Sequence, residues 1–402
     1  MTGDPSRLVD PVAAAGMLVV AIDRLPAWIL PAYGATWVSM PRLTALAARG
    51  IVFDRVIAET DDPVATLADL LGGAGEPAPL VAAAAARGWR TALVTDDTAA
   101  AVAGADITRV FDPARTTAGH EVEATCLARL GAAARAAVAA GDHRLVIVHA
   151  TSLGTRWDAP PGFREAYVAP EDPPPPPGAE VPDFEVAAGT DPDLLVGVRQ
   201  AFAGQLTLLD RCLGAVIDAA LASGWSVLVA GLRGLALGLH GHVGPGGVAP
   251  FGEIVHLPAL LADAAGRMAG QRHGGLVLPA DLGTTLVEAL GGRVAPPEPG
   301  SPWRGASLAG LLESWTSPHR DRVVAVTRGG AAVVTPGWHC VAGARRVALH
   351  AKPDDYFELC DVADRCPEVA EELGGLAATA AAGDTAAAWR APLSAVAVGG
   401  LG

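Results

Sequence analysis

Short apolar runs alternate with longer segments of helical periodicity over the first two thirds of the chain. The clearest apolar runs, each predicted to be a strand, are Met17–Ile22, Thr91–Val94, Leu145–His149 and Ser226–Ala230. Because these runs are apolar at nearly every position, we expect both of their faces to be covered, as in a parallel sheet between two layers of helices. The pattern therefore predicts a doubly wound α/β fold with a mostly parallel sheet.

The segments between these runs carry apolar residues at helical spacing. The predicted helices are Met40–Arg49, Pro79–Arg87, Glu121–Ala140 and Pro192–Gly224. One segment differs, because residues 158–183 contain the run Pro173–Pro177. This insertion is predicted to be a loop with local polyproline II character, serving either as a lid or as a surface excursion.

The pattern changes after about Pro318. Short β-like runs follow at Arg322–Thr327, Ala331–Thr335 and Arg346–His350, and then an acidic helix at Pro367–Leu376. Consecutive strands followed by a helix predict a small antiparallel sheet with a helix packed on it. We place a boundary near Thr316, which divides the chain into an α/β domain (1–315) and a C-terminal α+β subdomain (316–402).

Composition and charge narrow the class of protein. The hydrophobic fraction is 51% and the mean hydropathy is +0.34, which is enough apolar content for a large core. The net charge is −14, and the basic residues form no cluster. Nucleic acid is therefore not expected as a partner.

The cysteines and the N-terminus give no sign of a metal site or of export. The five cysteines lack the C-x-x-C spacing of zinc or redox sites, although a bridge between Cys360 and Cys366 stays open. No basic region precedes the first apolar run, and no stretch reaches the ~20 apolar residues of a membrane span. We therefore expect a cytoplasmic protein without a membrane span.

Four segments spread along nearly the whole chain resemble the motifs of one known family, in the same order. Ala21–Gly34 is similar to the family's opening D-T-L-R-A-D-H-L-x-x-Y-G, and Met40–Asp54 to the T-P-N-L-D-x-L-A-x-x-G-x-x-F-D that follows. Val229–Gly241 lies where the family has T-S-D-H-G-E-x-x-G-E-H-G, and Tyr356–Leu373 resembles its C-terminal segment. In these motifs the chain resembles the sulfatase family of the alkaline phosphatase superfamily, and the resemblance implies the same α/β fold with a C-terminal subdomain.

The resemblance also implies a chemical site, and most of its residues are replaced here. Family members bind a divalent cation through aspartates with Asn or His, and oxygen ligands suit Ca²⁺ or Mg²⁺. Asp23 matches the first ligand, but Leu232 and Arg233 stand in place of the Asp-His pair of the second ligand motif. The family's D-P-H histidine falls on Gly154 and its substrate lysine on Pro245. We expect Arg233 to pair with Asp23 in place of the metal.

The nucleophile segment corresponds to Thr60–Ala65, with a register uncertainty of one or two residues, and contains no Cys or Ser. Thr60 is the hydroxyl residue within reach, and Asp61 or Asp62 either takes part in chemistry or caps the next helix. His240 and His242 lie in a glycine-rich segment, where they are either a metal-binding pair or solvated loop residues. Asp96 and Asp97 are expected to cap a following helix.

Two functional interpretations follow. The leading one is a sulfatase-like pseudoenzyme without sulfuric ester hydrolase activity and without a bound cofactor, whose pocket binds an unknown small ligand or protein partner or serves in assembly. The alternative is a Ca²⁺- or Mg²⁺-dependent sulfate or phosphate ester hydrolase. Its unconventional site would use Asp23 as the metal ligand and Thr60, Asp62 and His240 as the catalytic residues.

Overall fold

A computed structural model describes residues 14–109, 121–247, 249–294, 305–312, 320–343 and 346–399. Its centre is a nine-stranded sheet in the order β10-β2-β11-β7-β1-β5-β3-β4, with β12 paired to β2. The strands are β1 (Met17–Asp23), β2 (Ile51–Ile57), β3 (Arg90–Thr95), β4 (Asp106–Arg109), β5 (His143–Ala150), β7 (Ser226–Arg233), β10 (His256–Leu257), β11 (Ala259–Ala262) and β12 (Gln271–Val277).

Strand β1 lies in the middle of this sheet, parallel to both β5 and β7. Its alternate side chains enter two different cores: Leu18, Val20 and Ile22 pack in one, and Met17, Val19 and Ala21 in the other. A strand buried on both faces needs apolar residues at every position, which explains the continuous run seen in the sequence. The predicted doubly wound, mostly parallel fold is confirmed.

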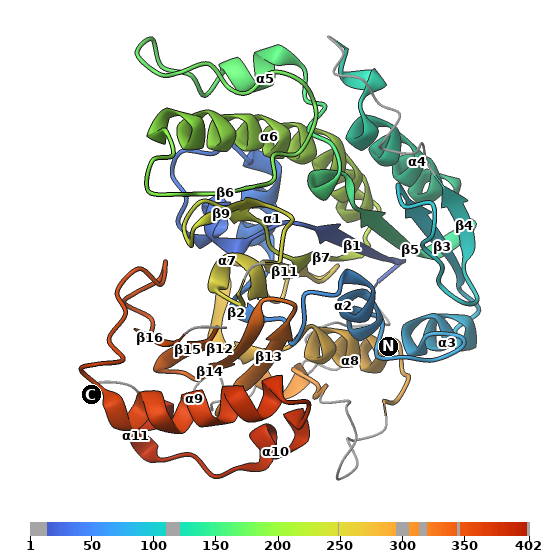
Figure 1. Cartoon of the computed structure of the whole chain (residues 1–402). Coiled ribbons are helices and arrows are strands. Elements are labelled where there is room, and N and C mark those ends of the chain that lie inside the picture. Colours follow the sequence, from blue (N-terminus) through green and yellow to red (C-terminus); the bar gives the residue numbers. More distant parts are fainter. Residues whose placement is uncertain are drawn as a thin grey trace.

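Helices cover both faces of the sheet (Figure 1). On one side are α1 (Pro41–Arg49), α4 (Cys126–Ala140) and α6 (Pro192–Ala222), whose apolar residues share a core. On the other side are α2 (Pro63–Leu70), α3 (Pro79–Ala86) and α8 (Pro279–Ala289). The predicted helices at 40–49, 79–87 and 192–224 match α1, α3 and α6 closely, whereas α4 begins at Cys126 rather than at Glu121.

The C-terminal part forms a separate antiparallel sheet in the order β13-β14-β15-β16. Its strands are β13 (Val323–Thr327), β14 (Gly330–Val334), β15 (Trp338–Ala342) and β16 (Val347–Ala351), and its helices are α9 (Pro367–Ala381), α10 (Thr385–Arg390) and α11 (Ala395–Gly399). Helix α9 packs on this sheet through Val369, Leu373 and Ala377. The predicted boundary at Thr316 falls outside the described residues and stays a prediction.

The proline-rich insertion contains α5 (Pro161–Glu165) and runs beside α6. A third sheet joins β6 (Phe184–Glu185), β9 (His242–Gly244) and β8 (Ala236–Leu237). The glycine-rich segment at 238–247 is therefore partly a strand rather than only a loop. A short helix α7 (Gly252–Val255) follows it.

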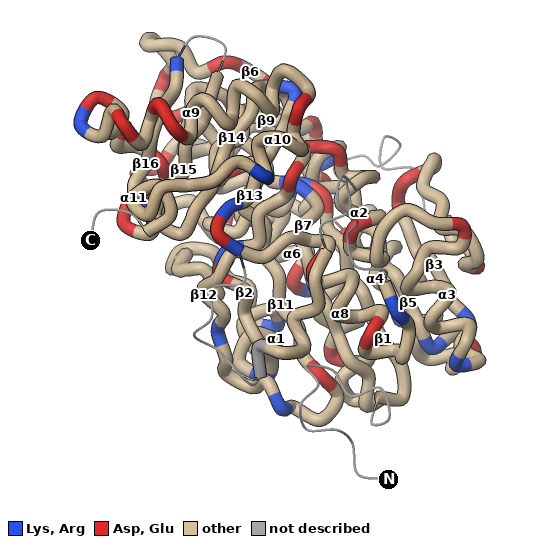
Figure 2. Tube along the Cα trace, turned by 90° about the horizontal axis from the view of Figure 1, so that it is seen from below, with Lys and Arg blue, Asp and Glu red and all other residues tan. Residues whose placement is uncertain are grey.

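Acidic and basic positions are interspersed along the described trace (Figure 2), and no extended basic face is visible there. Cys360 and Cys366 are both free thiols, so the bridge left open between them is not formed. Among the described residues, no helix combines the length and the apolar character that a membrane span needs.

Candidate functional site

Asp23 is the last residue of β1, between the ends of β5 and β7. Ligands of open α/β sheets bind at this carboxyl edge. The residue is only 4% exposed, and a register shift after Ile22 brings it opposite Arg233 of β7. The backbone N–H of Arg24 donates to Asp23 Oδ1 at 3.0 Å.

Arg233 holds both oxygens of the Asp23 carboxylate. Its Nε donates to Oδ1 at 2.8 Å and its Nη2 donates to Oδ2 at 3.0 Å. The expected pairing is therefore present, in the bidentate form that is the strongest geometry of an arginine and a carboxylate. The Arg233 side chain is 17% exposed, so the pair is only partly screened by water.

The same guanidinium reaches the segment that resembles the family's nucleophile motif. Arg233 Nη1 donates to the carbonyl of Asp61 at 3.2 Å. The Asp61 carboxylate accepts from Arg328 Nε at 2.9 Å, so it does not cap α2. Asp62 does cap α2, because its Oδ1 accepts from the amide of Val64 at 2.9 Å. The capping interpretation is thus confirmed for Asp62 and wrong for Asp61.

Arg24 is a third arginine at this edge. It lies in the left-handed region at φ 61°, is 4% exposed, and donates through Nη2 to the Pro245 carbonyl at 3.0 Å. A Cβ added at Gly154 would lie 2.6 Å from Arg24 Cγ. Gly154 and Pro245 are the positions where the resemblance places a histidine and a lysine, so the Arg24 side chain occupies the space between them.

Burial, together with the charge of Arg233, lowers the pKa of Arg24 to about 10, which leaves it charged at neutral pH. The edge therefore holds three guanidinium groups, on Arg24, Arg233 and Arg328, against the two carboxylates of Asp23 and Asp61. Arg233 and Arg328 are paired with these carboxylates, whereas the Arg24 side chain donates to backbone carbonyls.

This set of groups does not fit a hard divalent cation. Ca²⁺ takes about six to eight oxygen ligands, and carboxylates are the main ones that proteins supply. Here Asp23 is already bound by Arg233 and Asp61 by Arg328. Within the described ranges no group of three or more His, Cys, Asp or Glu side chains is arranged to hold a metal ion.

Thr60 and Asp62 contact each other through a hydrogen bond between the backbone of Asp62 and the side chain of Thr60. Thr60 Oγ1 accepts from the amide of Asp62 at 3.1 Å. The Asp62 carboxylate is used by the helix cap described above. The structure thus brings these two candidates next to Asp61 and Arg233 at the same edge.

The two histidines of the glycine-rich segment have different partners. His240 Nδ1 bonds Glu253 Oε1 at 2.8 Å, and its ring stacks on Phe251 at a centroid distance of 3.8 Å. His242 Nε2 bonds Asp183 at 2.7 Å. Burial works against protonation of His240, but the hydrogen bond and charge of Glu253 outweigh it and raise its pKa. The two rings do not share a ligand.

A buried carboxylate next to this edge was misjudged from the sequence. Asp96 does not cap the next helix along the chain; it is fully buried and accepts hydrogen bonds from Thr151 N at 2.7 Å and Ser152 N at 3.1 Å. Burial raises its pKa, and burial lowers the pKa of the neighbouring His149. Asp97 accepts from Ala99 N in a turn. In the sequence Asp96 is only a carboxylate that follows a strand, and an aspartate that caps a helix has the same local pattern.

Two arginines were also not identified from the sequence. Arg24 directly follows Asp23, so the sequence does show a cation next to the one residue that matches a metal ligand of the family. Arg328 lies between β13 and β14 and meets Asp61 across 267 positions, which no local pattern reveals.

Comparison with solved structures shows which known proteins share this fold. The phosphonate monoester hydrolase of Agrobacterium radiobacter is similar at a TM-score of 0.70 and 17% identity, over 88% of this chain and 93% of that chain. The phosphonate monoester hydrolase of Silicibacter pomeroyi has a TM-score of 0.69 and 16% identity, over 91% and 94%. A 2-O GAG sulfatase has a TM-score of 0.66 and 15% identity, over 92% and 93%.

No family model matches the sequence, and no curated protein matches it. The structural similarity nevertheless spans nearly the whole chain. The chain therefore has the fold of the sulfatases and phosphonate monoester hydrolases of the alkaline phosphatase superfamily, which confirms the resemblance seen in its motifs at the level of the fold.

Proposed function

We propose that this chain is a pseudoenzyme with a sulfatase fold, which does not hydrolyse sulfate or phosphate esters by the metal-dependent route. The observation that carries the proposal is the bidentate contact of Arg233 with Asp23. A metal ion at Asp23 would have to displace this guanidinium and then lie next to a permanent positive charge. Coulomb repulsion between the two cations opposes such binding.

The positions around Asp23 support the same conclusion. The positions corresponding to the family's histidine and lysine are Gly154 and Pro245, which carry no titratable group, and Arg24 fills the space beside them. A guanidinium stays protonated at neutral pH and cannot act there as a general base. The edge is thus suited to holding a fixed arrangement of charges, as a binding or assembly site would, more than to moving protons.

A second candidate is a hydrolase with an unconventional site, favoured by the fold that the chain shares with phosphonate monoester hydrolases. Under this alternative Thr60 or Asp62 attacks, His240 assists proton transfer, and Ca²⁺ or Mg²⁺ binds at Asp23. It requires Arg233 to move away from Asp23, and it requires His240 Nε2, which bonds the Glu358 carbonyl at 3.2 Å, to be freed for proton transfer.

The test is an ester hydrolysis assay. Wild type and Asp23→Ala are incubated with 4-nitrophenyl sulfate, 4-nitrophenyl phosphate and a 4-nitrophenyl phosphonate monoester, each with Ca²⁺, Mg²⁺ or a chelator. We expect product release by wild type to equal that of the variant in every condition. Metal-dependent release that Asp23→Ala abolishes would refute the proposal and establish the hydrolase. A cytoplasmic location remains part of the proposal and is tested by microscopy of the tagged protein in its native host.

A further inference from the structure

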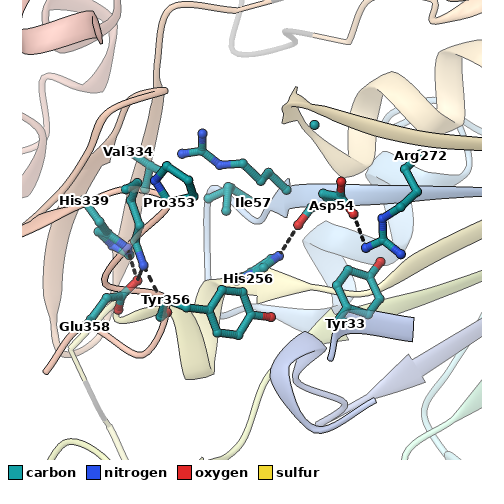
Figure 3. Close-up of a pocket in the computed structure, with 13 residues that line it drawn as sticks. Tyr33, Asp54, Ile57, His256, Arg272, Val334, His339, Pro353, Tyr356 and Glu358 are labelled. Carbon is teal, nitrogen blue, oxygen red and sulfur yellow. Dashed lines mark hydrogen bonds and ion pairs between the residues drawn. The ribbon is translucent and has the colours of Figure 1, made fainter. Parts of the chain in front are cut away.

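A cavity of about 390 Å³ lies between the edge of the main sheet and the C-terminal sheet (Figure 3). The main sheet contributes residues of β2, β10 and β12, and the C-terminal part contributes residues of β14, β15 and the segment after β16. Neither Asp23 nor any of the three arginines around it lines this cavity. Its volume lies within the range of small-molecule sites in proteins.

Aromatic rings form much of the wall. The His256 ring meets Tyr33 edge to face at 6.0 Å and Tyr356 at 5.9 Å. Burial lowers the pKa of His256 to about 4, so the ring is neutral at physiological pH, and its Nε2 donates to the Asp54 carbonyl at 2.7 Å. Figure 3 shows the Tyr356 ring extending from the C-terminal part toward Tyr33, with His256 beside them. These faces suit a flat, apolar ring.

Most polar groups of the cavity already have partners. The Tyr33 hydroxyl accepts from Ala259 N at 2.8 Å and donates to a backbone carbonyl. Lys352 Nζ donates to Glu358 Oε1 at 2.8 Å, and Arg272 pairs with Asp54. These groups complete the wall, and they leave little hydrogen-bonding capacity for a ligand.

The hydroxyl of Tyr356 is an exception. Its oxygen is buried and has no hydrogen-bond partner among the described residues. A buried hydroxyl without a partner is unfavourable by about 1–3 kcal/mol, so such groups usually face a bound molecule or water. Burial raises the pKa of this phenol, which therefore remains a hydrogen-bond donor.

Arg55 is the second exception. Its Nη1 and Nη2 donate to the carbonyls of Pro336 at 2.9 Å and Thr335 at 2.6 Å, and it pairs with no carboxylate in the described part of the chain. Burial lowers the pKa of Arg55 to about 10, so it is still charged at neutral pH. A half-buried cation without a counter-ion is unfavourable, and a bound carboxylate would offset that cost.

We propose that this cavity binds a small aromatic carboxylate that also carries a hydrogen-bond acceptor on its ring. Arg55 holds the carboxylate, His256 and Tyr33 pack against the ring, and the Tyr356 hydroxyl donates to the ring substituent. A monoanion matches the lining, because Arg272 and Lys352 already pair with Asp54 and Glu358, and Arg55 leaves one positive charge to be offset. The site is separate from the Asp23 edge, so it does not depend on whether that edge is catalytic.

The experiment is a calorimetric titration of the full chain with 4-hydroxyphenylacetate, phenylacetate and 4-hydroxyphenylacetamide. We expect the first acid to bind best and the amide, which lacks the charge, to bind at least about tenfold more weakly, because a charged hydrogen bond is lost. Tyr356→Phe should weaken 4-hydroxyphenylacetate about threefold to tenfold and leave phenylacetate unchanged. This variant removes an oxygen without a partner, so the fold should be kept.

Three further variants complete the design. Arg55→Gln should abolish the preference for the acid over the amide, and Arg55→Lys should retain part of it. Tyr167→Phe is the matched control, since that hydroxyl contacts Ser39 and Thr207 outside the cavity, and its binding should equal wild type. Absence of binding by both acids at millimolar concentration would overturn the proposal. Equal affinity for acid and amide, or an equal effect of Tyr356→Phe on both acids, would overturn it too.

Discussion

The pairing of Arg233 with Asp23 can be measured with a double-mutant cycle. Asp23→Asn removes the carboxylate charge at nearly constant volume, and Arg233→Met keeps the length of the side chain without its charge. Either single change leaves one charge of the pair without its partner. The double variant leaves neither, so the cycle isolates the pairwise energy.

The expected loss of unfolding free energy follows from how deeply the Asp23–Arg233 pair is buried. Removing one partner of a fully buried pair is unfavourable by about 3–5 kcal/mol, whereas exposed pairs contribute about 0–1 kcal/mol. The Asp23 side chain is 5% exposed and that of Arg233 17%, so the pair lies nearer to the buried limit. We expect each single variant to lose about 2–3 kcal/mol of unfolding free energy, with a coupling energy of about 2 kcal/mol.

The assay is urea unfolding followed by tryptophan fluorescence for wild type, both single variants and the double variant at one pH and salt concentration. The double variant should be more stable than the sum of the two single losses predicts. A coupling energy within about 0.5 kcal/mol of zero, which is the usual error of additivity, would refute the reasoning. In that case Arg233 would be free to leave Asp23.

Three further outcomes are expected. Gly154→Ala should destabilise the protein by about 1–3 kcal/mol by forcing Arg24 aside, and adding Arg24→Ala should relieve most of that loss. Chemical unfolding measures both effects, and a loss that persists in the double variant would contradict the close contact between Gly154 and Arg24. Glu358 is buried, but the charge and hydrogen bond of His339 outweigh that burial and hold the pKa of Glu358 below its usual value. The charged form of Glu358 therefore stabilises the fold above about pH 4.3, and this stabilisation is lost as the pH falls below that value. The stability gap between wild type and Glu358→Gln should therefore narrow by about 1.4 kcal/mol per pH unit below that point; a constant gap in unfolding curves from pH 7 to pH 3 contradicts the linkage. Asp62→Ala should cost about 1 kcal/mol through loss of the α2 cap with Val64, and an unchanged denaturation midpoint would show that the cap contributes nothing.

The fold was predictable because its signals are local. The run Met17–Ile22 is apolar throughout, and this pattern indicated a strand buried on both faces without any knowledge of its neighbours. The position of Asp23 at the carboxyl edge followed from that strand. The contact with Arg233 followed from the motif resemblance, which placed both residues at one metal site.

The rest of the edge depends on contacts between distant segments. Arg24 donates to Pro245 across 221 positions, and Arg328 meets Asp61 across 267. Asp96 looked like a helix cap because a carboxylate after a strand has the same local pattern whether it binds the next turn or, as here, Thr151 of a neighbouring strand end. Such choices are made by tertiary packing.

The cavity around Arg55 was also invisible in the sequence. Its wall combines β2, β10, β12 and the C-terminal sheet, which come together only in the folded chain. Nothing in the local pattern around Arg55 or Tyr356 distinguishes them from surface residues.

The most direct test of the central claim is a calorimetric titration of metal-free protein with Ca²⁺ and with Mg²⁺, using Asp23→Ala as the control. Because Arg233 occupies both carboxylate oxygens, we predict that wild type and the control give the same weak heats. Tight binding that disappears in Asp23→Ala would contradict the account and show that Asp23 still serves as a metal ligand.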